Sequence, residues 1–410
     1  MRSLLAFLLC GTAFGQSFYL KPGDRVVFYG DSITDQRLYT TFTETYVLTR
    51  FPRLDVSFVH SGWGGDRVTG GGGGPIDVRL KRDVFAYKPT VLTVMLGMND
   101  GRVRAFDPEV FNTFATGYRH IVESAKQAVP GIRITGILPS PYDDVTRPPL
   151  FEGGYNAVLV RYGQFIRELA QKGGLTVADL NGPVVAALEK AQAADPQLAA
   201  RIVPDRVHPG PGGHLLMAAA LLKAWGAPAV VTEVEIDAAA KRATRTANTE
   251  VKELEAGEGL SWTQIDAALP MPFDAKDSVL MLAVRSSDFI ETLNRQPLKV
   301  TGLSEPRYTL RIDGEPVGTF TREQLAEGLN LAVLPTPMAR QAAEVHQLTL
   351  AHNNIHAARW RQVQVPLEKY HAERAPAAME ALDALEVELI ARQRAAAQPQ
   401  ARRYQLVPER

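Results

Sequence analysis

The chain has 410 residues, 45% of them hydrophobic, so it is long enough to form two or three domains around a large buried core. Lys plus Arg and Asp plus Glu each number 45, which gives a formal net charge of zero. A balanced charge excludes the strong basic field with which proteins attract nucleic acid or anionic membranes, and we expect neither as a partner.

The first 15 residues have the pattern of a secretory signal peptide. Arg2 precedes an apolar run over residues 4–9, and small residues follow up to Gly15, where we expect cleavage. We therefore expect a secreted or periplasmic bacterial protein without a transmembrane segment, because the apolar run is too short to cross a bilayer. Cys10, the only cysteine, would leave with the signal. A lipoprotein acylated at Cys10 is the less favoured alternative, since bulky Leu9 stands where a small residue is expected.

The segment 16–228 alternates between two kinds of pattern. Apolar runs of strand type recur at 26–29, 56–60, 91–96, 132–138 and 175–178. Apolar side chains at helical spacing follow the third run, and again extend from Gly212 to Trp225. This alternation predicts βαβ units, hence one α/β domain with a parallel sheet and helices on both faces.

After residue 228 the pattern changes to that of a β-rich accessory segment, which we place at 229–335. Residues 279–284 form an apolar run of strand type. Asp313-Gly314, between two alternating runs, is a strong hairpin signal. Thr321 and Gln324 have the spacing of a capping box and predict a short helix.

The last segment, 336–410, is predicted to be helical. Four apolar residues recur at three- and four-residue spacing and are far more typical of packing than of function: Met379, Leu382, Leu385 and Leu389. The tail from Ala395 is rich in Gln, Arg and Pro, and we expect it to be frayed.

His352 and His356 are four residues apart, as zinc ligands on a helix can be. However, Asn353 replaces the Glu of the zinc-protease motif, and no third ligand is evident, so a structural use is favoured over metal binding. Arg359 and Trp360, just beyond, could belong to a contact between domains.

The first strand-type run stops abruptly at Gly30-Asp31-Ser32. Ligands of open α/β sheets bind beyond the carboxyl ends of the strands, so Ser32 would stand at such a site. A serine hydroxyl becomes a good nucleophile only when a base takes its proton, so a catalytic Ser32 requires a histidine, a group that orients it, and donors for an oxyanion. Taken alone, the three residues favour an ordinary turn with a helix cap.

Three further segments stand where a catalytic serine needs them. Gly65 follows the second run, and a glycine there lets a backbone N–H approach an oxyanion closely. Asn99 ends the third run, and its amide can donate another hydrogen bond. Asp205 and His208 precede the last helix of this segment, where the carboxylate can fix the tautomer of the ring. Each has an ordinary alternative, as a turn glycine, a cap, an ion-pair partner or a surface histidine, but the ordered set favours a site.

Together these segments resemble the four sequence blocks of the SGNH (GDSL-type) hydrolases, whose name lists the Ser, Gly, Asn and His found here at Ser32, Gly65, Asn99 and His208. The resemblance covers about residues 25–225. It implies a flavodoxin-like α/β/α three-layer sandwich with a parallel sheet, here with a C-terminal β-rich and helical extension. It also implies hydrolysis of carboxylic esters through an acyl-enzyme.

By this resemblance Ser32 is the nucleophile, His208 the general base and acid, and Asp205 its orienter. The oxyanion hole would consist of the Ser32 and Gly65 backbone N–H groups and the Asn99 side chain. The family's second block often begins with Asn, where this chain has His60, which leaves one supporting hydrogen bond open.

Several residues beside these blocks are candidate substrate contacts. Asp31 adjoins the serine, and Trp63 and Arg67 flank the oxyanion glycine. For Trp63, packing beneath the loop is an equally good interpretation. The five-glycine run 70–74 lacks the Lys-Ser/Thr of a phosphate loop, and we expect a mobile loop there.

The sequence thus favours a secreted serine esterase that needs no metal or cofactor, because dipoles hold the oxyanion. An O-acetylated polysaccharide or oligosaccharide is the favoured substrate, which the β-rich segment could help to hold. A lipid esterase, lysophospholipase or thioesterase would use the same residues. From a different class, the chain could be a non-catalytic glycan-binding or envelope protein.

Overall fold

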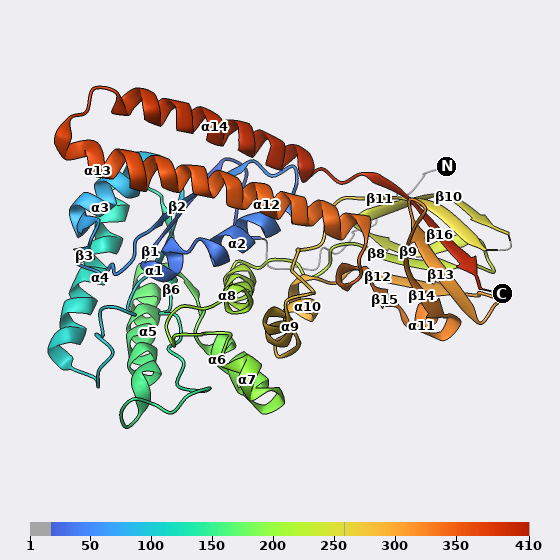
Figure 1. Ribbon diagram of the computed structural model, residues 1–410, viewed down its shortest axis with the longest axis horizontal. Coiled ribbons are helices and arrows are strands. Elements are labelled where there is room, and N and C mark those ends of the chain that lie inside the picture. The colour runs from blue at the N-terminus through green and yellow to red at the C-terminus, as the bar shows by residue number, and fades with distance from the viewer. Residues whose placement is uncertain (1–17, 258, 410) are drawn as a thin grey trace, which may run out of the picture.

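The computed structural model describes residues 18–257 and 259–409. The expected signal peptide, with Cys10, lies outside the described residues. Figure 1 shows an α/β body at one end, a β-rich body at the other, and a long helical hairpin that runs across the α/β body. None of the helices in the described part of the chain is both long and apolar enough to cross a bilayer.

The α/β body is built on a five-stranded parallel sheet with the order β2-β1-β5-β6-β7. Its strands are β1 (Asp24–Gly30), β2 (Val56–Gly62), β5 (Val91–Met95), β6 (Arg133–Ile137) and β7 (Thr176–Ala178). All five match the expected runs, and the order 2-1-3-4-5 is that of the flavodoxin-like fold. β5 is buried along its whole length, because helices cover both faces of the sheet.

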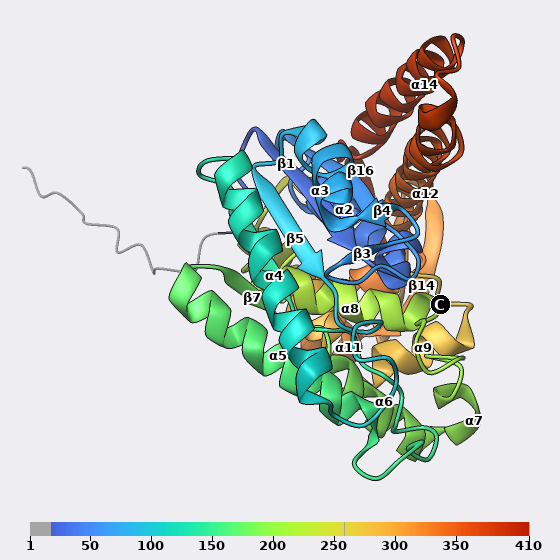
Figure 2. The same ribbon diagram turned by 90° about the vertical axis from the view of Figure 1, so that its left-hand side faces the viewer.

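Helices connect and cover these strands, as Figures 1 and 2 show. They are α1 (Ser32–Asp35), α2 (Leu38–Arg50), α3 (Ile76–Asp83), η1 (Phe85–Tyr87), α4 (Pro108–Ala128), α5 (Gly154–Gly173), α6 (Gly182–Ala194), α7 (Pro196–Ala199) and α8 (Pro211–Ala224). The two helices expected from apolar spacing are α4 and α8. α2 packs against α8, and α4 packs against α5, so the three-layer sandwich is confirmed.

The β-rich body contains two sheets, β10-β11-β16-β13-β14 and β15-β12-β8-β9. Its elements are β8 (Glu233–Asp237), β9 (Arg242–Ala247), β10 (Thr249–Ala256), β11 (Leu260–Asp266), β12 (Pro297–Thr301), β13 (Arg307–Ile312), β14 (Glu315–Thr321), α11 (Arg322–Glu327), β15 (Leu329–Asn330), η2 (Leu331–Val333) and β16 (Ala401–Pro408). The hairpin at Asp313-Gly314 is confirmed, and both residues have left-handed φ angles, 55° and 82°. The capping box of Thr321 and Gln324 is also confirmed.

The strand expected at 279–284 is wrong, because these residues lie in a helix, α9 (Ser278–Arg285). The Asp277 carboxylate caps it by accepting from two backbone N–H groups. The short helix α10 (Phe289–Leu293) follows, and both helices bury their apolar side chains in the core of the α/β body. The first core therefore extends beyond the boundary that we expected at residue 228.

The expected frayed tail is a second correction. The last strand, β16, pairs with β11 on one side and β13 on the other, in the middle of a sheet. Tyr404 and Leu406 alternate inward, and Tyr404 stacks on Trp262 at 5.1 Å between ring centroids. Residues 336–410 therefore do not form a separate segment, because their final strand completes the β-rich body.

The hairpin that runs across the α/β body consists of α12 (Pro337–Ala357), the π-helix η3 (Ala358–Gln364), α13 (Val365–Leu367), η4 (Glu368–Tyr370) and α14 (Ala375–Ala396). α12 packs along α2 of the α/β body, and α14 packs on α12 (Figure 1). Of the apolar stripe on α14, Leu385 is exposed and the other three residues are half-buried, so only part of the stripe packs as expected.

Candidate active site

The turn from β1 to α1 places a serine at the carboxyl edge of the sheet. A Cβ on Gly30 would collide with the Thr34 side chain and lie 2.8 Å from the carbonyl oxygen of Met95, so the strand end requires glycine. Asp31 then caps α1, because its carboxylate accepts a hydrogen bond from the Ile33 N–H at 3.1 Å. Ser32 is the first helical residue and is half-buried.

Ser32, His208 and Asp205 lie in one hydrogen-bonded chain. The Nε2 atom of His208 is 2.8 Å from Ser32 Oγ, and its Nδ1 atom is 2.7 Å from Asp205 Oδ2. The second carboxylate oxygen, Oδ1, accepts from the backbone N–H groups of Val207 at 3.0 Å and His208 at 2.7 Å. The structure thus places Ser32 beside a histidine that lies 176 positions later in the chain.

The Asp205 carboxylate is held in its ionised form. Burial opposes ionisation, but the hydrogen bonds from the His208 backbone and ring outweigh it and lower the pKa of Asp205. Arg206 has a left-handed φ of 73° and anchors the turn by donating to the carbonyl of Pro148 at 3.0 Å. Because the turn is fixed, the carboxylate can keep the His208 ring in one orientation.

Three groups that could donate to an oxyanion lie around Ser32. The backbone N–H groups of Ser32 and Gly65 have no hydrogen-bond acceptor within the described part of the chain. A Cβ on Gly65 would meet no atom within 4 Å, so the site has room for a larger residue. Its φ of 79° lies in the left-handed region, however, and this backbone conformation favours glycine. The Asn99 amide donates to the carbonyl of Asp66 at 3.0 Å and, having two N–H bonds, can still offer one.

Buried carboxyl groups support these loops from below. Asp100 accepts from the Val68 N–H at 3.0 Å and so ties the two loops together. Burial raises the pKa of Asp31 to about 7 and that of Asp100 to about 6. Asp31 is only 1% exposed, so our expectation that it contacts substrate is wrong, because its carboxyl group is used beneath the site as a helix cap.

The two other expected substrate contacts differ in their exposure. Arg67 is exposed and donates from Nε to the carbonyl of Asn99 at 3.2 Å. Trp63 is half-buried, and its ring packs edge-on against Trp360 of the hairpin at 5.4 Å and beneath the guanidinium of Arg361 at 3.6 Å. Trp63 therefore packs, as one of our two interpretations expected, and its partners include the hairpin as well as the glycine loop.

The glycine run forms a small hairpin, β3 (Gly70–Gly71) and β4 (Gly74–Pro75), and the expectation of a mobile loop is wrong. Its backbone lies flat on Trp63: a Cβ on Gly73 would be 2.7 Å from a ring carbon of Trp63 and 2.7 Å from Cδ of Arg79. Close packing of the backbone, and not mobility, accounts for the glycines here.

His60 belongs to a buried polar cluster behind the site. Its ring lies 2.6 Å from the Thr40 hydroxyl and 3.2 Å from Glu44, and burial lowers the pKa of His60 to about 4. His352 lies 2.7 Å from the same Glu44, and His352 and His356 both face Glu386, at 3.5 and 3.6 Å. These histidines connect α2, α12 and α14, which agrees with the structural use that we favoured. The described residues include no group of three or more His, Cys, Asp or Glu arranged to hold a metal ion.

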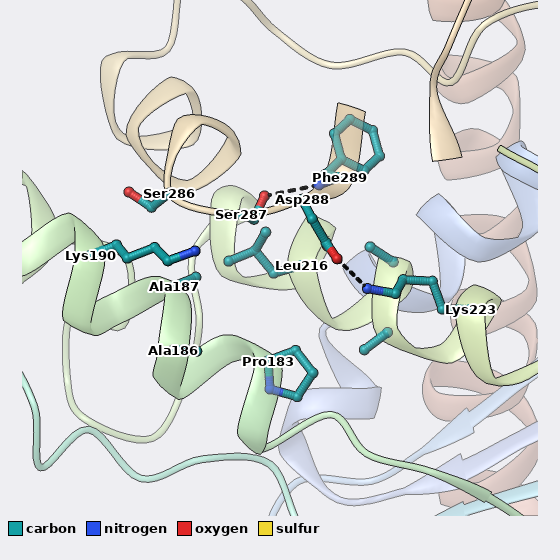
Figure 3. A pocket seen from close by; sticks show the side chains of 12 residues that line it. Pro183, Ala186, Ala187, Lys190, Leu216, Lys223, Ser286, Ser287, Asp288 and Phe289 are labelled. Carbon is teal, nitrogen blue, oxygen red and sulfur yellow. Dashed lines mark hydrogen bonds and ion pairs between the residues drawn. The ribbon is translucent and has the colours of Figure 1, made fainter. Parts of the chain in front are cut away.

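The site is open at the surface. The side chains of His208 and Asp205 are 35% and 55% exposed. A hollow of about 250 Å³ lies between α6, α8 and the α9–α10 turn. Figure 3 shows its lining, which includes the ion pair of Lys223 and Asp288. That hollow is lined by none of the residues around Ser32, so it is separate from the candidate active site.

Comparisons with known proteins find relatives of the α/β body. Residues 28–216 match the GDSL-like lipase/acylhydrolase family. An acetylxylan esterase of Geobacillus stearothermophilus is 24% identical over 228 residues, which cover 50% of this chain and 94% of the relative. A solved structure of an acetylxylan esterase from that organism, Axe2, is 23% identical with a TM-score of 0.42, covering 51% of this chain and 96% of that one.

A second solved structure is similar over nearly the whole chain. It is a gut microbial diltiazem-metabolizing enzyme, 27% identical, with a TM-score of 0.83, and the match covers 95% of this chain and 98% of that one. The β-rich body and the hairpin therefore belong to an architecture that this neighbour shares. Residues 28–216 form a GDSL-like lipase/acylhydrolase domain, and the protein is an ester hydrolase.

Proposed function

We propose that this ester hydrolase uses Ser32 as its nucleophile and removes short acyl groups, acetyl above all, from carbohydrate esters. The observation that carries the proposal is the chain of contacts from Asp205 through His208 to Ser32, with both distances below 3 Å. Gly65 and Asn99 stand beside it as donors. A non-catalytic binding protein would have no need for this arrangement.

The proposed reaction follows from these positions. His208 Nε2 takes the proton of Ser32 Oγ as the oxygen attacks the ester carbonyl, and the Asp205 carboxylate stabilises the imidazolium that forms. The tetrahedral oxyanion accepts hydrogen bonds from the Ser32 and Gly65 N–H groups and the Asn99 amide. His208 then gives its proton to the departing alcohol. Water, deprotonated by the same ring, releases the acid from the acyl-enzyme.

The open site supports a short acyl group. A long acyl chain needs an apolar cleft that removes it from water. Here the side chains of His208 and Asp205 are 35% and 55% exposed, and the hollows of about 250, 410, 520 and 630 Å³ that lie among the described residues are lined by other side chains. A surface site of this kind suits an acetyl group on a bulky alcohol better than a fatty acyl chain.

A carbohydrate as the alcohol is supported by the acetylxylan esterase relative, at 24% identity. We do not assign glycan binding to the β-rich body, because its large aromatic rings, Trp262, Tyr308 and Tyr404, are buried in its core. Trp63 does not offer a free face to a sugar ring either, because Arg361 lies over it with Cζ 3.6 Å from the ring centroid and the backbone at Gly73 packs against it.

The test compares the wild type with Ser32→Ala and with the control Ser304→Ala, which alters an exposed serine in the β-rich body. We expect Ser32→Ala to lose at least about a thousandfold in kcat and to lose labelling by a fluorophosphonate. The melting temperature should stay near that of the control. Equal labelling of Ser32→Ala and the wild type would refute the nucleophile.

The substrate is tested with p-nitrophenyl acetate, butyrate and octanoate, acetylated xylan, and diltiazem, whose ester group is an acetate. We expect the acetates to be cleaved fastest. A preference for octanoate together with no action on acetylated xylan would favour a lipid esterase. We also propose that the protein is exported, and a mature N-terminus that retains residues 1–15 would refute this.

A further inference from the structure

The tip of the hairpin reaches the loop that carries Gly65. The π-helix Ala358–Gln364 directs two consecutive side chains, Trp360 and Arg361, toward this loop from a position almost 300 residues later in the chain. Short π-helical turns within helices occur frequently at functional sites. The contacts of these two side chains show what a π-helical turn contributes at this position.

Arg361 acts on the residue before Gly65. Its Nη1 atom is 3.0 Å from both carboxylate oxygens of Asp35, and its guanidinium lies flat on Trp63, with Cζ 3.6 Å from the ring centroid. Asp35 ends α1, the short helix that begins at Ser32. The same carboxylate accepts a hydrogen bond from the backbone N–H of Gly64 at 3.1 Å. Arg361 is therefore connected to Gly64 through one carboxylate.

Trp360 acts on the residue after Gly65. Its ring is buried, and Nε1 donates to Asp83 Oδ1 at 2.7 Å. Asp83 is ion-paired with Arg79, and Nε of Arg79 donates to Asp66 Oδ2 at 2.8 Å. The side chains of Asp83, Arg79 and Asp66 are fully buried, so each depends on its partner for compensation of its charge. Trp360 is thereby connected to Asp66.

We propose that the C-terminal hairpin is a positioning element of the active site: Arg361 and Trp360 fix Gly64 and Asp66, and so direct the N–H of Gly65 at the oxyanion. Gly65 itself is exposed, and a Cβ there would meet nothing within 4 Å, so its direction depends on its two neighbours. The inference rests on the oxyanion role of Gly65 in the proposed function.

If Arg361 and Trp360 direct the N–H of Gly65, removing either contact should lower kcat more than it changes KM. An oxyanion donor acts on charge that develops in the transition state, so a misdirected N–H lowers kcat and leaves KM nearly unchanged. Complete removal of one such donor costs about a hundredfold to a thousandfold in kcat. A donor that is displaced and still present should cost less, about tenfold to a hundredfold.

The experiment uses the full chain and compares Arg361→Gln with Arg359→Gln. Arg359 is the matched control, because it lies on the same π-helix but pairs with Asp383 inside the hairpin, at 2.9 Å. Arg361→Lys restores a cation for Asp35 but not the flat stacking on Trp63, and we expect it to fall between wild type and Arg361→Gln. We measure kcat and KM for p-nitrophenyl acetate, the melting temperature, and inhibition by a short trifluoromethyl ketone, whose adduct with Ser32 carries an oxyanion.

For Arg361→Gln we expect kcat to fall about tenfold to a hundredfold, KM to change less than about threefold, and the inhibition constant to rise by the same factor as kcat/KM falls. Arg359→Gln should match the wild type in all three. Equal kcat in the two Gln variants, or a lower kcat without a weaker inhibitor, would overturn the positioning role.

A wild type without esterase activity would instead overturn the proposed function. Should Arg361→Gln fail to fold, Trp360→Phe serves in its place, because it keeps an aromatic ring and removes the donor to Asp83. The same kinetic pattern is then expected, and unchanged kcat in this variant would again overturn the inference.

Discussion

Replacing Asp205 by asparagine should impair catalysis more than replacing it by alanine. Oδ1 of Asp205 accepts from two backbone N–H groups, at 3.0 and 2.7 Å, while Oδ2 faces His208 Nδ1. In Asp205→Asn the amide has a single oxygen, which the two N–H groups hold in place, so its NH2 group must face Nδ1. The ring then accepts at Nδ1 and carries its proton on Nε2, where it cannot take the proton of Ser32.

The cost of this wrong tautomer in a serine triad is about 10⁴ in kcat, or roughly 5 kcal/mol in the barrier. In Asp205→Ala water can replace the carboxylate, because the Asp205 side chain is 55% exposed. The ring then keeps the productive tautomer, and we expect a smaller loss of about 10²- to 10³-fold. Stability should follow the opposite order, since asparagine keeps the acceptor for the turn and alanine does not.

The assay is kcat/KM for p-nitrophenyl acetate in both variants, with melting temperatures from thermal unfolding and Ser32→Ala as the baseline. Activity of Asp205→Asn equal to or above that of Asp205→Ala would refute the tautomer argument. So would a loss of less than tenfold in the asparagine variant.

Two further predictions concern pH. Asp31→Asn keeps the cap of α1 and removes a carboxyl group whose pKa burial raises to about 7. The wild-type protein has the full stability that the neutral carboxyl allows below about pH 4, and it loses this stability as the pH rises through 7. The variant should therefore melt at a higher temperature than the wild type at about pH 8. Equal melting temperatures there would contradict this. For His352, burial opposes protonation, but Glu44 and Glu386 outweigh it and raise its pKa to about 9, so its contribution is complete below about pH 6.5 and lost as the pH rises through 9. Between about pH 7 and 9.5 the melting temperature of the wild type should therefore fall more steeply than that of His352→Gln. An equal dependence of the two melting temperatures on pH would argue against a charged His352.

The sequence could predict the α/β body because its signals are local. Each buried parallel strand is a continuous apolar run, and each candidate residue follows the end of a strand or precedes α8. Ser32, Gly65 and Asn99 stand at the carboxyl ends of β1, β2 and β5, which are neighbours in the sheet. Their convergence follows from the order of the strands, and His208 reaches them from the loop between α7 and α8.

Local patterns failed where pairing partners are distant in the chain. The apolar run at 279–284 fits a strand or a helix equally well, and its contact with the first core decides for a helix. β16 looks like a polar tail, because Arg402, Arg403 and Gln405 surround its inward residues Tyr404 and Leu406. α2 is buried from Tyr39 to Arg50, although its sequence is rich in threonine, because the hairpin covers the face that would otherwise meet water.

The sequence alone therefore determined the sheet, its chemistry and the residues that could carry it. Only the tertiary structure decided how the loop around Gly65 is held. The sequence suggested a contact between domains for Arg359 and Trp360, but Arg359 pairs inside the hairpin, and nothing in the sequence indicated Arg361 or the partners of Trp360. The role of Trp360 and Arg361 depends on Asp83 and Asp35, each more than 270 positions away. Contacts between segments so far apart arise from the packing of whole elements, which no window of sequence contains.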